Sequence, residues 1–462
     1  DALKANGYKP AVSFLETAQA LVLENDWANN FDDVFSMYRS LAESYFLCRE
    51  FNKGEKITFI LLNKAKSILQ KAQILDMQAI HYENAGQLEK SIDISLKALR
   101  LFGYRLYKKT TMARIGIQLI ICKLSLGFRQ PMDLLDGPEI TDELTKLKIK
   151  ILMSVTQSAY LAGYANLYPL CILKGTTLIH RKGICPEAAW MLAVYNVVLF
   201  NIIHDTRNGA KYARLTKELV ERNKEPFLKG RGLFSYGTFI SFWHSPQSVS
   251  REYFKRSIAL NYQTGNQFDT AVSAINYAVY APTIDAEKTS RLHKKHMALI
   301  KEMGVKNFEE SSYLVDGLIN SYLGKTTLGT TISTDSYNEY RSLERMRKNK
   351  YLNGIAGYHV VKMEILFLRG KIKAVLEHGK RAASLLDSVM GTYYELPYRI
   401  FRSVAMLRHF KNLNIWNKLL AFAIIPTNYF IIRIWRHYNP DTFSSYLLYF
   451  RAEIMQALGR PL

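Results

Sequence analysis

The sequence predicts an all-α protein, in which irregular helical hairpins follow one another as a right-handed superhelix (an α-solenoid). Apolar residues recur with helical spacing in nearly every segment, and no segment shows the strict alternation of paired strands. Comparable patterns of small residues follow turns expected at Gly86, Asn208-Gly209 and Gly370, which indicates stacked repeats. Hydrophobic residues make up 48% of the 462 residues, so the chain can bury a substantial core.

The clearest hairpin is expected between Ile74 and Tyr104. Gly86 supplies its turn, and the small residues Ala79, Ser91 and Ala98 stand where the two helices must approach closely. This spacing resembles a tetratricopeptide (TPR) unit, whose period is about 34 residues. Ser91 stands where such units usually have Ala. The resemblance implies TPR-like hairpins throughout the array.

The other elements of the first half follow from the same helical period. The segment from Arg129 to Pro138 contains turn residues and is expected to be a loop. Pro186 suits a first helical position, where its missing N–H has no partner to lose. Helices are expected over Ala2–Glu24, Phe31–Phe51, Gly54–Ala72, Thr141–Leu161, Leu167–Arg181, Pro186–Ile203 and Asn208–Arg222.

A polar, β-branched stretch from Thr326 to Ser336 predicts a loop or a seam between two parts of the array. We therefore expect residues 1–325 to form its first part and residues 337–462 its continuation. The last helix, Ser444–Ala457, is followed by Gly459, which takes the place of the turn after the first helix of a repeat. A solenoid needs a capping repeat, so the chain is expected to be a piece of a longer protein, which fits its start at Asp1.

One apolar run raises the question of a membrane. Leu419 to Trp435 is shorter than the roughly 20 residues that a spanning helix needs. Pro426 interrupts it and Arg433 lies inside its end. We expect a pair of short buried helices here and no transmembrane segment.

The chain is strongly basic, with a formal net charge of +22. Two segments, Ile94 to Met132 and Leu396 to Pro440, contain no acidic residue. Such segments attract acidic proteins, nucleic acid or anionic lipid, although a solvated basic surface without a partner has the same composition. In the first segment, the expected partner-binding residues are Arg105, Lys108, Lys109 and Arg114.

Aromatic residues suggest two further contacts. Tyr-basic pairs such as Tyr104-Arg105 can stack on single-stranded nucleic acid, but tyrosines of helical arrays more often fill seams between helices, so nucleic acid is the less favoured partner. Trp243 and His244 are candidates for partner binding on the inner surface. The favoured alternative is a hairpin corner, with Trp243 packed between repeats and Pro246 opening the next helix.

No constellation for catalysis is found. Gly324-Lys325-Thr326 is not a phosphate loop, because Ile319 stands where the first glycine is required. His293 and His296 lack a further ligand, and a solvated basic face is favoured over a metal site. We expect no enzyme activity, no cofactor and no metal in this chain. The scattered cysteines indicate reduced thiols in a cytoplasmic protein: Cys48, Cys122, Cys171 and Cys185.

The order of several motifs resembles the helical-repeat region of large multidomain signalling proteins of bacteria and fungi. In that family, an AAA/STAND-type ATPase module precedes the repeats, a Ser/Thr-kinase-like domain often stands at the N-terminus, and a GAF domain and a histidine kinase often follow. Asn266 departs from the Asp that is more frequent there. The matching stretches are AESYFLC at 42–48, GQLEKSID at 86–93, ALRLFGY at 98–104, FWHSP at 242–246, Gly265-Asn266, AEI at 452–454 and LGR at 458–460.

The resemblance implies a non-enzymatic scaffold or sensor. Its concave surface would bind a protein, peptide or effector, and the bound state would bias the flanking ATPase or kinase modules. The family's Walker motifs, kinase loop and phospho-accepting histidine are absent from this chain. The alternative is a free-standing TPR-like adaptor that binds an acidic protein or nucleic acid through its basic surfaces. An enzyme built on a helical toroid has no supporting residues.

Overall fold

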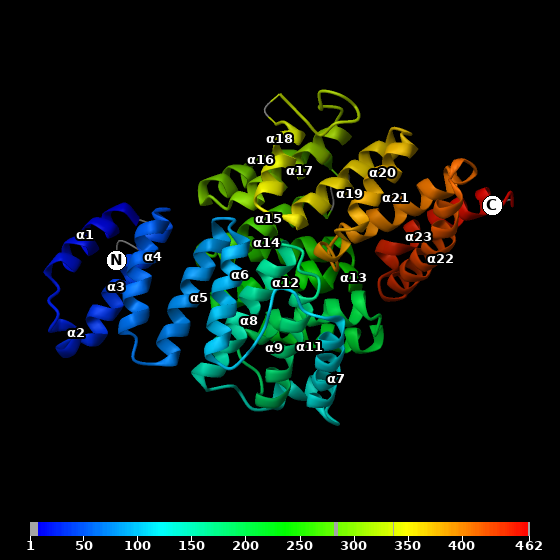
Figure 1. The fold of residues 1–462 in the computed structure, drawn as a ribbon. Helices are drawn as coiled ribbons and strands as arrows, with labels where there is room; N and C mark the ends of the chain where they lie inside the picture. Colours follow the sequence, from blue (N-terminus) through cyan, green and yellow to red (C-terminus); the bar gives the residue numbers. More distant parts are fainter. Residues whose placement is uncertain (1–7, 281–284, 336, 461–462) are drawn as a thin grey trace.

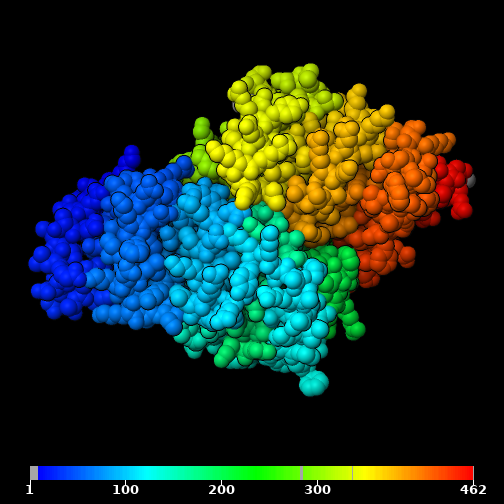
Figure 2. All heavy atoms as spheres, in the orientation of Figure 1, coloured from blue at the N-terminus to red at the C-terminus, as the bar shows by residue number. Residues whose placement is uncertain are grey.

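A computed structural model describes residues 8–280, 285–335 and 337–460 of the chain. This part contains 23 α-helices and no β-strand beyond isolated bridges, which confirms the all-α class (Figure 1). The molecule is elongated, with the N-terminal helices at one end and the C-terminal helices at the other (Figure 2).

The first twelve helices are α1 Tyr8–Leu21, α2 Asp26–Asn29, α3 Phe31–Leu47, α4 Phe51–Lys64, α5 Ile68–Asn84, α6 Leu88–Leu101, α7 Met112–Leu126, α8 Glu143–Leu161, α9 Leu167–Lys182, α10 Ala188–Asn196, α11 Thr206–Arg222 and α12 Pro226–Tyr236. The others are α13 Phe242–His244, α14 Gln247–Gln263, α15 Gln267–Val279, α16 Ala286–Met303, α17 Lys306–Tyr322, α18 Glu339–Lys348, α19 Leu352–Leu368, α20 Ile372–Ala383, α21 Glu395–Arg408, α22 Ile415–Tyr438 and α23 Pro440–Ala457. Two π-helical segments, η2 Val197–Ile202 and η3 Gly237–Ser241, extend α10 and α12.

Six pairs of consecutive helices are joined by short turns that share one backbone feature. A residue with positive φ lies in each turn, where it ends the first helix and lets the chain reverse. The hairpin expected around Gly86 is confirmed as α5–α6, and its small residues Ala79, Ser91 and Ala98 are fully buried. The turn residues are Arg49, Gly86, Gly163, Gly265, Gly304 and Gly370, with φ between 64° and 77°.

Two predicted N-terminal helices are divided differently in the structure. The helix expected up to Phe51 ends at Leu47, because Arg49 adopts φ of 64° and starts a turn. The helix expected across Gly54–Ala72 is broken before Ser67. Ser67 and Gln70 form a reciprocal capping box that starts α5. The apolar pattern continues across both boundaries. A positive φ sets the first boundary, and a helix cap sets the second.

The turn predicted at Asn208-Gly209 is wrong. Helix α11 already begins at Thr206, and the chain reverses at His204, whose φ is 54°. Gly209 lies inside the helix, where a Cβ atom would approach the Phe200 ring to 3.2 Å. The glycine therefore serves close packing between α11 and η2, although Asn-Gly pairs usually mark turns.

Helices α16–α19, from the second half of the chain, contact hairpins of the first half. Arg49 Nη2 donates to the carbonyl of Gly304 at 3.0 Å, and Lys350 pairs with Glu89 at 3.4 Å. In Figure 1, α16–α19 consequently lie beside the α5–α8 region. One hydrophobic cluster extends from α5 to α23 and includes residues on both sides of the loop between α17 and α18. The division into residues 1–325 and 337–462 stays a prediction.

The segment between α20 and α21 passes through the interior of this arrangement. Its backbone carbonyls accept hydrogen bonds from three buried or half-buried side chains that belong to other hairpins. Tyr160 OH donates to the carbonyl of Met390 at 3.0 Å, and Trp243 Nε1 donates to that of Gly391 at 3.1 Å. Asn353 Nδ2 donates to the carbonyl of Ser388. The space between these hairpins is thus filled by the chain itself, and ligand access has to be sought elsewhere.

The apolar run near the C-terminus forms one long helix instead of the expected pair of short buried ones. Helix α22 continues for 24 residues through Pro426, which removes a single backbone donor. Among the described helices, it is the one that is long and apolar enough to cross a membrane. Only 22% of its most apolar 18-residue stretch is buried inside the protein. The expectation of burial was wrong, because most of the apolar face of α22 lies at the surface.

Candidate binding groove

A large cleft in the described part of the chain lies between two sets of hairpins. Helices α3, α5 and α8 form one wall, and the turn between α14 and α15 contributes the other. The cleft has a volume of about 850 Å³, within the range of small-molecule and peptide pockets. Charged side chains lining this groove are Arg39, Glu43, Asp76, Glu143, Lys146, Lys150 and Glu187, and its amides are Gln73, Asn84, Gln263 and Gln267.

The charges of the groove are incompletely paired. Lys150 Nζ lies 2.9 Å from Asp76 Oδ2, but the other oxygen of this buried carboxylate has no partner among the described residues. Glu187 Oε2 is likewise unpartnered. Burial raises the pKa of Glu43, although Arg39 and Lys150 oppose this shift. Both unpartnered oxygens are therefore buried in the wall of the groove, where the described residues supply no donor to them.

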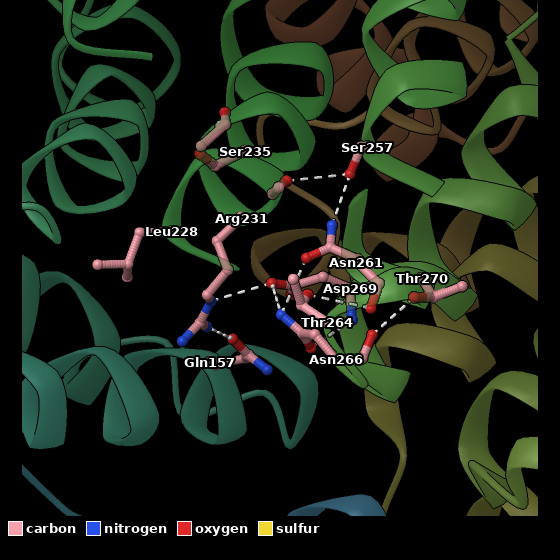
Figure 3. Close-up of polar contacts among 12 residues, drawn as sticks. Gln157, Leu228, Arg231, Ser235, Ser257, Asn261, Thr264, Asn266, Asp269 and Thr270 are labelled. Atoms are coloured by element: carbon pink, nitrogen blue, oxygen red, sulfur yellow. Dashed lines mark hydrogen bonds and ion pairs between the residues drawn. The ribbon is translucent and has the colours of Figure 1, made fainter. Parts of the chain in front are cut away.

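A polar hub adjoins the groove and is shown in Figure 3. Arg231 forms an ion pair with the fully buried Asp269, with Nε 2.9 Å from Oδ2, and its Nη2 donates to Gln157 Oε1 at 3.0 Å. Asn266 Nδ2 donates to Asp269 Oδ2 at 2.7 Å and to Asn261 Oδ1 at 3.1 Å. This network fixes the α14–α15 turn against α8 and α12, and so sets one wall of the groove.

Glu83 is a second buried carboxyl next to this hub. Ser158 Oγ donates to Glu83 Oε1 at 2.7 Å, and burial raises the pKa of Glu83 to about 8, although this hydrogen bond and Arg231 lower it. The side chain is consequently protonated in the folded protein at neutral pH. It shares one face of α5 with Asp76, two helical turns away.

Replacing Glu83 with Gln should stabilise the protein at neutral and alkaline pH. The raised pKa means that Glu83 contributes stability below pH 4.5, which is lost as the pH rises through about 8. Gln keeps the acceptor for Ser158 and carries no titrating proton, so Glu83→Gln should raise the free energy of unfolding by roughly 2 kcal/mol at pH 8. Urea denaturation at several pH values would measure this, with the exposed Glu344→Gln as control. An unchanged pH dependence would contradict the assignment.

The predicted basic edge is only partly available. Arg105, Lys109 and Arg114 are exposed and form no ion pair with the described residues. Lys108 instead pairs with Glu89 at 2.7 Å and with Asp93 at 2.8 Å. These four residues lie around the start of α7 and are not among the groove residues.

The sequence-predicted aromatic pair does not form a surface site. Trp243 is fully buried, stacked on Phe443 at 5.9 Å, and close to Trp435 at 4.6 Å. This burial fits the packed hairpin corner that the sequence favours, and the partner-binding role of Trp243 stays a prediction. His244 is half-buried between Phe200 and Tyr438.

The second acid-free segment is less basic at the surface than its sequence indicates. Arg399 is buried and its Nη2 lies 2.7 Å from Glu395, just outside the segment. Arg408 Nε donates to Glu453 at 3.0 Å. Acids that are distant in sequence or at a boundary can neutralise such a segment, which composition alone does not reveal.

A second cavity and the histidine pair singled out from the sequence lie apart from the groove. The cavity, of about 100 Å³, is lined mainly by aromatic and aliphatic side chains and by the segment before α21, and it is too small for ligands that occupy about 300 Å³ or more. No group of three acidic, Cys or His side chains in the described ranges could hold a metal ion. The predicted solvated face at His293 is wrong for that residue, which is buried, its Nε2 lying 2.9 Å from the carbonyl oxygen of Ser312.

The groove residues were not predicted from the sequence. The spacing of Asp76 and Glu83 on an otherwise apolar helix face could have revealed a polar stripe on α5. The three-residue spacing of Asn266 and Asp269 could have revealed a cap. Their convergence with Arg231 depends on the packing of distant hairpins and has no local signal. In the comparisons, no family model and no curated protein matches the chain.

Proposed function

We propose that this chain is a non-enzymatic, TPR-like scaffold that binds an extended protein segment in the groove. The hairpins would form a right-handed superhelix, as the resemblance implies. The observation that carries the proposal is the groove of about 850 Å³ with the charged and amide side chains that line it. Amide side chains along the groove can both donate and accept, which suits the backbone of an extended peptide.

In a longer cytoplasmic parent protein, binding in the groove would bias flanking ATPase or kinase modules. The groove lies between hairpins that are distant in sequence, so a ligand that contacts both walls would stabilise one relative position of the two sets. Such a ligand shifts an equilibrium only by its difference in affinity for the two positions. The motif order that resembles the signalling family supports this assignment.

A peptide selected from a random displayed library on the immobilised chain would test the groove. We expect Arg39→Glu, an exposed and unpaired groove residue, to weaken binding at least about tenfold, as the loss of one charge-assisted contact would. Arg105→Glu is the matched control outside the groove and should leave the affinity unchanged. Peptides that respond only to Arg105→Glu would overturn the groove assignment.

That outcome would instead favour a second candidate function, an adaptor for acidic proteins or nucleic acid. The exposed and unpaired Arg105, Lys109 and Arg114 favour this candidate. Binding through these charges should weaken sharply from low to physiological salt, because exposed charges are screened.

A further inference from the structure

Helix α7 turns its apolar face to solvent. Gln118 is buried, whereas the most exposed side chains of the helix body are aliphatic. Ile117, Ile120 and Leu124 are 60%, 61% and 74% exposed, and their spacing of three and four residues places them on one face. Phe128, two residues after the helix, is fully exposed. The helix is apolar on both sides, because Ile115, Leu119 and Cys122 pack against the core.

Helix α22 repeats this arrangement. Its buried face carries Asn428, Ile432 and Trp435. Its first half exposes a dense group of large apolar side chains, and a further aromatic ring follows one to two turns later. These residues are Ile415, Trp416, Leu419, Phe422 and Phe430, which are between 54% and 76% exposed.

Each of these helices belongs to one of the two acid-free segments, 94–132 and 396–440. Cations therefore border the exposed apolar faces without any acidic residue in the same segment. Arg114 borders the face of α7, and Lys418, Arg433 and Arg436 lie on α22. None of these four forms an ion pair within the described residues, so their charges stay available.

The C-terminal ends of the two helices meet at one place. Lys123, in the last turn of α7, pairs with Asp205 at 2.8 Å. Tyr438, the last residue of α22, donates from its hydroxyl to Thr206 Oγ1 at 3.1 Å. Both contacts are made with the start of α11. The two helices thus approach each other at their C-terminal ends, although the chain separates them by almost three hundred residues. The exposed group in the first half of α22 lies roughly 24 Å or more along the helix from this contact.

We infer that α7 and α22 form a docking surface for an anionic lipid bilayer. Their apolar side chains enter the boundary between headgroups and acyl chains, and the bordering Lys and Arg side chains contact the lipid phosphates. Trp416 suits this boundary, because an indole ring is apolar and carries one donor. A second copy of the chain is disfavoured as occupant, since contact between like faces would bring two acid-free segments together.

Trp416 offers a direct test. The other four tryptophans are at least nine-tenths buried, whereas Trp416 is 76% exposed. The purified chain would be mixed with vesicles of phosphatidylcholine and phosphatidylglycerol, and with vesicles of phosphatidylcholine alone. We expect co-sedimentation with the anionic vesicles, a blue shift of Trp416 fluorescence and release at high salt. Trp416→Phe should bind and lose the blue shift.

Charge placed on the exposed faces should abolish docking. Ile120→Glu combined with Leu419→Glu should weaken vesicle binding at least about tenfold, since two apolar contacts are replaced by repelled charges. Phe59→Glu, at an equally exposed apolar residue on α4, is the matched control. Circular dichroism would verify that each variant is folded.

Several outcomes would overturn the proposal. One is the absence of binding to anionic vesicles. Equal binding to neutral vesicles would also refute it. So would a dimer that Ile120→Glu and Leu419→Glu dissociate, because the occupant of the surface would then be a second copy of the chain. Resistance to high salt and to alkaline carbonate would indicate that α22 spans the bilayer. None of these results depends on whether the groove binds a peptide.

Discussion

Below pH 6.5 the protein should lose stability steeply and unfold near pH 5. The cause is that seven of its ten histidines are buried or half-buried. Burial lowers the pKa of His359 to about 3, with the neighbouring His378 and Arg381 adding to the effect. It lowers the pKa of six others to about 4: His81, His180, His244, His293, His296 and His378.

The direction follows from proton linkage. An unfolded histidine titrates near pH 6.5, whereas these seven stay neutral in the folded protein down to about pH 4. Between these values the unfolded chain binds more protons, so the stability present above pH 6.5 is lost as the pH falls.

Carboxyls whose pKa is raised by burial act in the opposite direction, and two of them have large shifts. Burial raises the pKa of Glu83 to about 8 and that of Glu364 to about 7, so both are protonated in the folded protein before they are in the unfolded chain. Seven histidines less two carboxyls leave a net uptake of up to about five protons on unfolding. This corresponds to roughly 7 kcal/mol per pH unit at the steepest point, against a total stability of about 5–15 kcal/mol.

Urea denaturation between pH 8 and pH 5 would measure this loss. His359 and His378 form a hydrogen-bonded pair with their Nδ1 atoms 3.0 Å apart, and the double variant His359→Gln/His378→Gln should lower the steepness by about two protons. The exposed His437→Gln is the control and should leave the pH dependence unchanged. A midpoint that stays constant from pH 7 to pH 5 would contradict the expected burial.

The sequence predicted the helical class well because apolar period and glycine turns are local properties. Gly86 and Gly370 were identified for this reason. Arg49 was not, because a turn with positive φ at a non-glycine residue leaves no pattern in the sequence. The exposed faces of α7 and α22 were missed for a related reason. An apolar period indicates which residues share a face, and it does not indicate whether another helix covers that face.

The candidate groove was harder to predict from the sequence than the helices were. Asp76 and Lys150 are separated by more than seventy residues and meet only because α5 and α8 pack together. Conversely, Arg399 was counted as part of a basic surface, although a four-residue spacing from Glu395 predicts an ion pair on one helix. The structure buries this ion pair, which also forms hydrogen bonds with Asn201 and Asn428.

Replacing Arg399 with Met should destabilise the protein by about 3–5 kcal/mol, because a charge is left buried without its partner. Glu395 is fully buried and accepts from Arg399 Nε at 3.1 Å and from Nη2 at 2.7 Å. Its other oxygen accepts from Asn201 Nδ2 at 3.2 Å and from the backbone N–H of Gly391 at 3.1 Å. Without the guanidinium, this carboxylate would have to take up a proton or admit water.

The same network attaches α22 to the rest of the molecule. Arg399 Nη1 donates to Asn428 Oδ1 at 2.8 Å, and Asn428 Nδ2 donates to Ser403 Oγ at 2.9 Å. Asn428 is one of only five buried residues on α22. We therefore expect Arg399→Met to lower the hydrogen-exchange protection of α22 before that of the N-terminal hairpins.

A double-mutant cycle separates the ion pair from packing. Glu395→Gln/Arg399→Met removes both charges and keeps acceptors for Asn201 and Gly391, so it should recover at least half of the stability lost in Arg399→Met. Arg433→Met, at an exposed position of α22, should change stability by no more than about 0.5 kcal/mol. If Arg399→Met costs as little as Arg433→Met, the ion pair does not anchor α22, and the exposed face of that helix must be held in place by its apolar contacts alone.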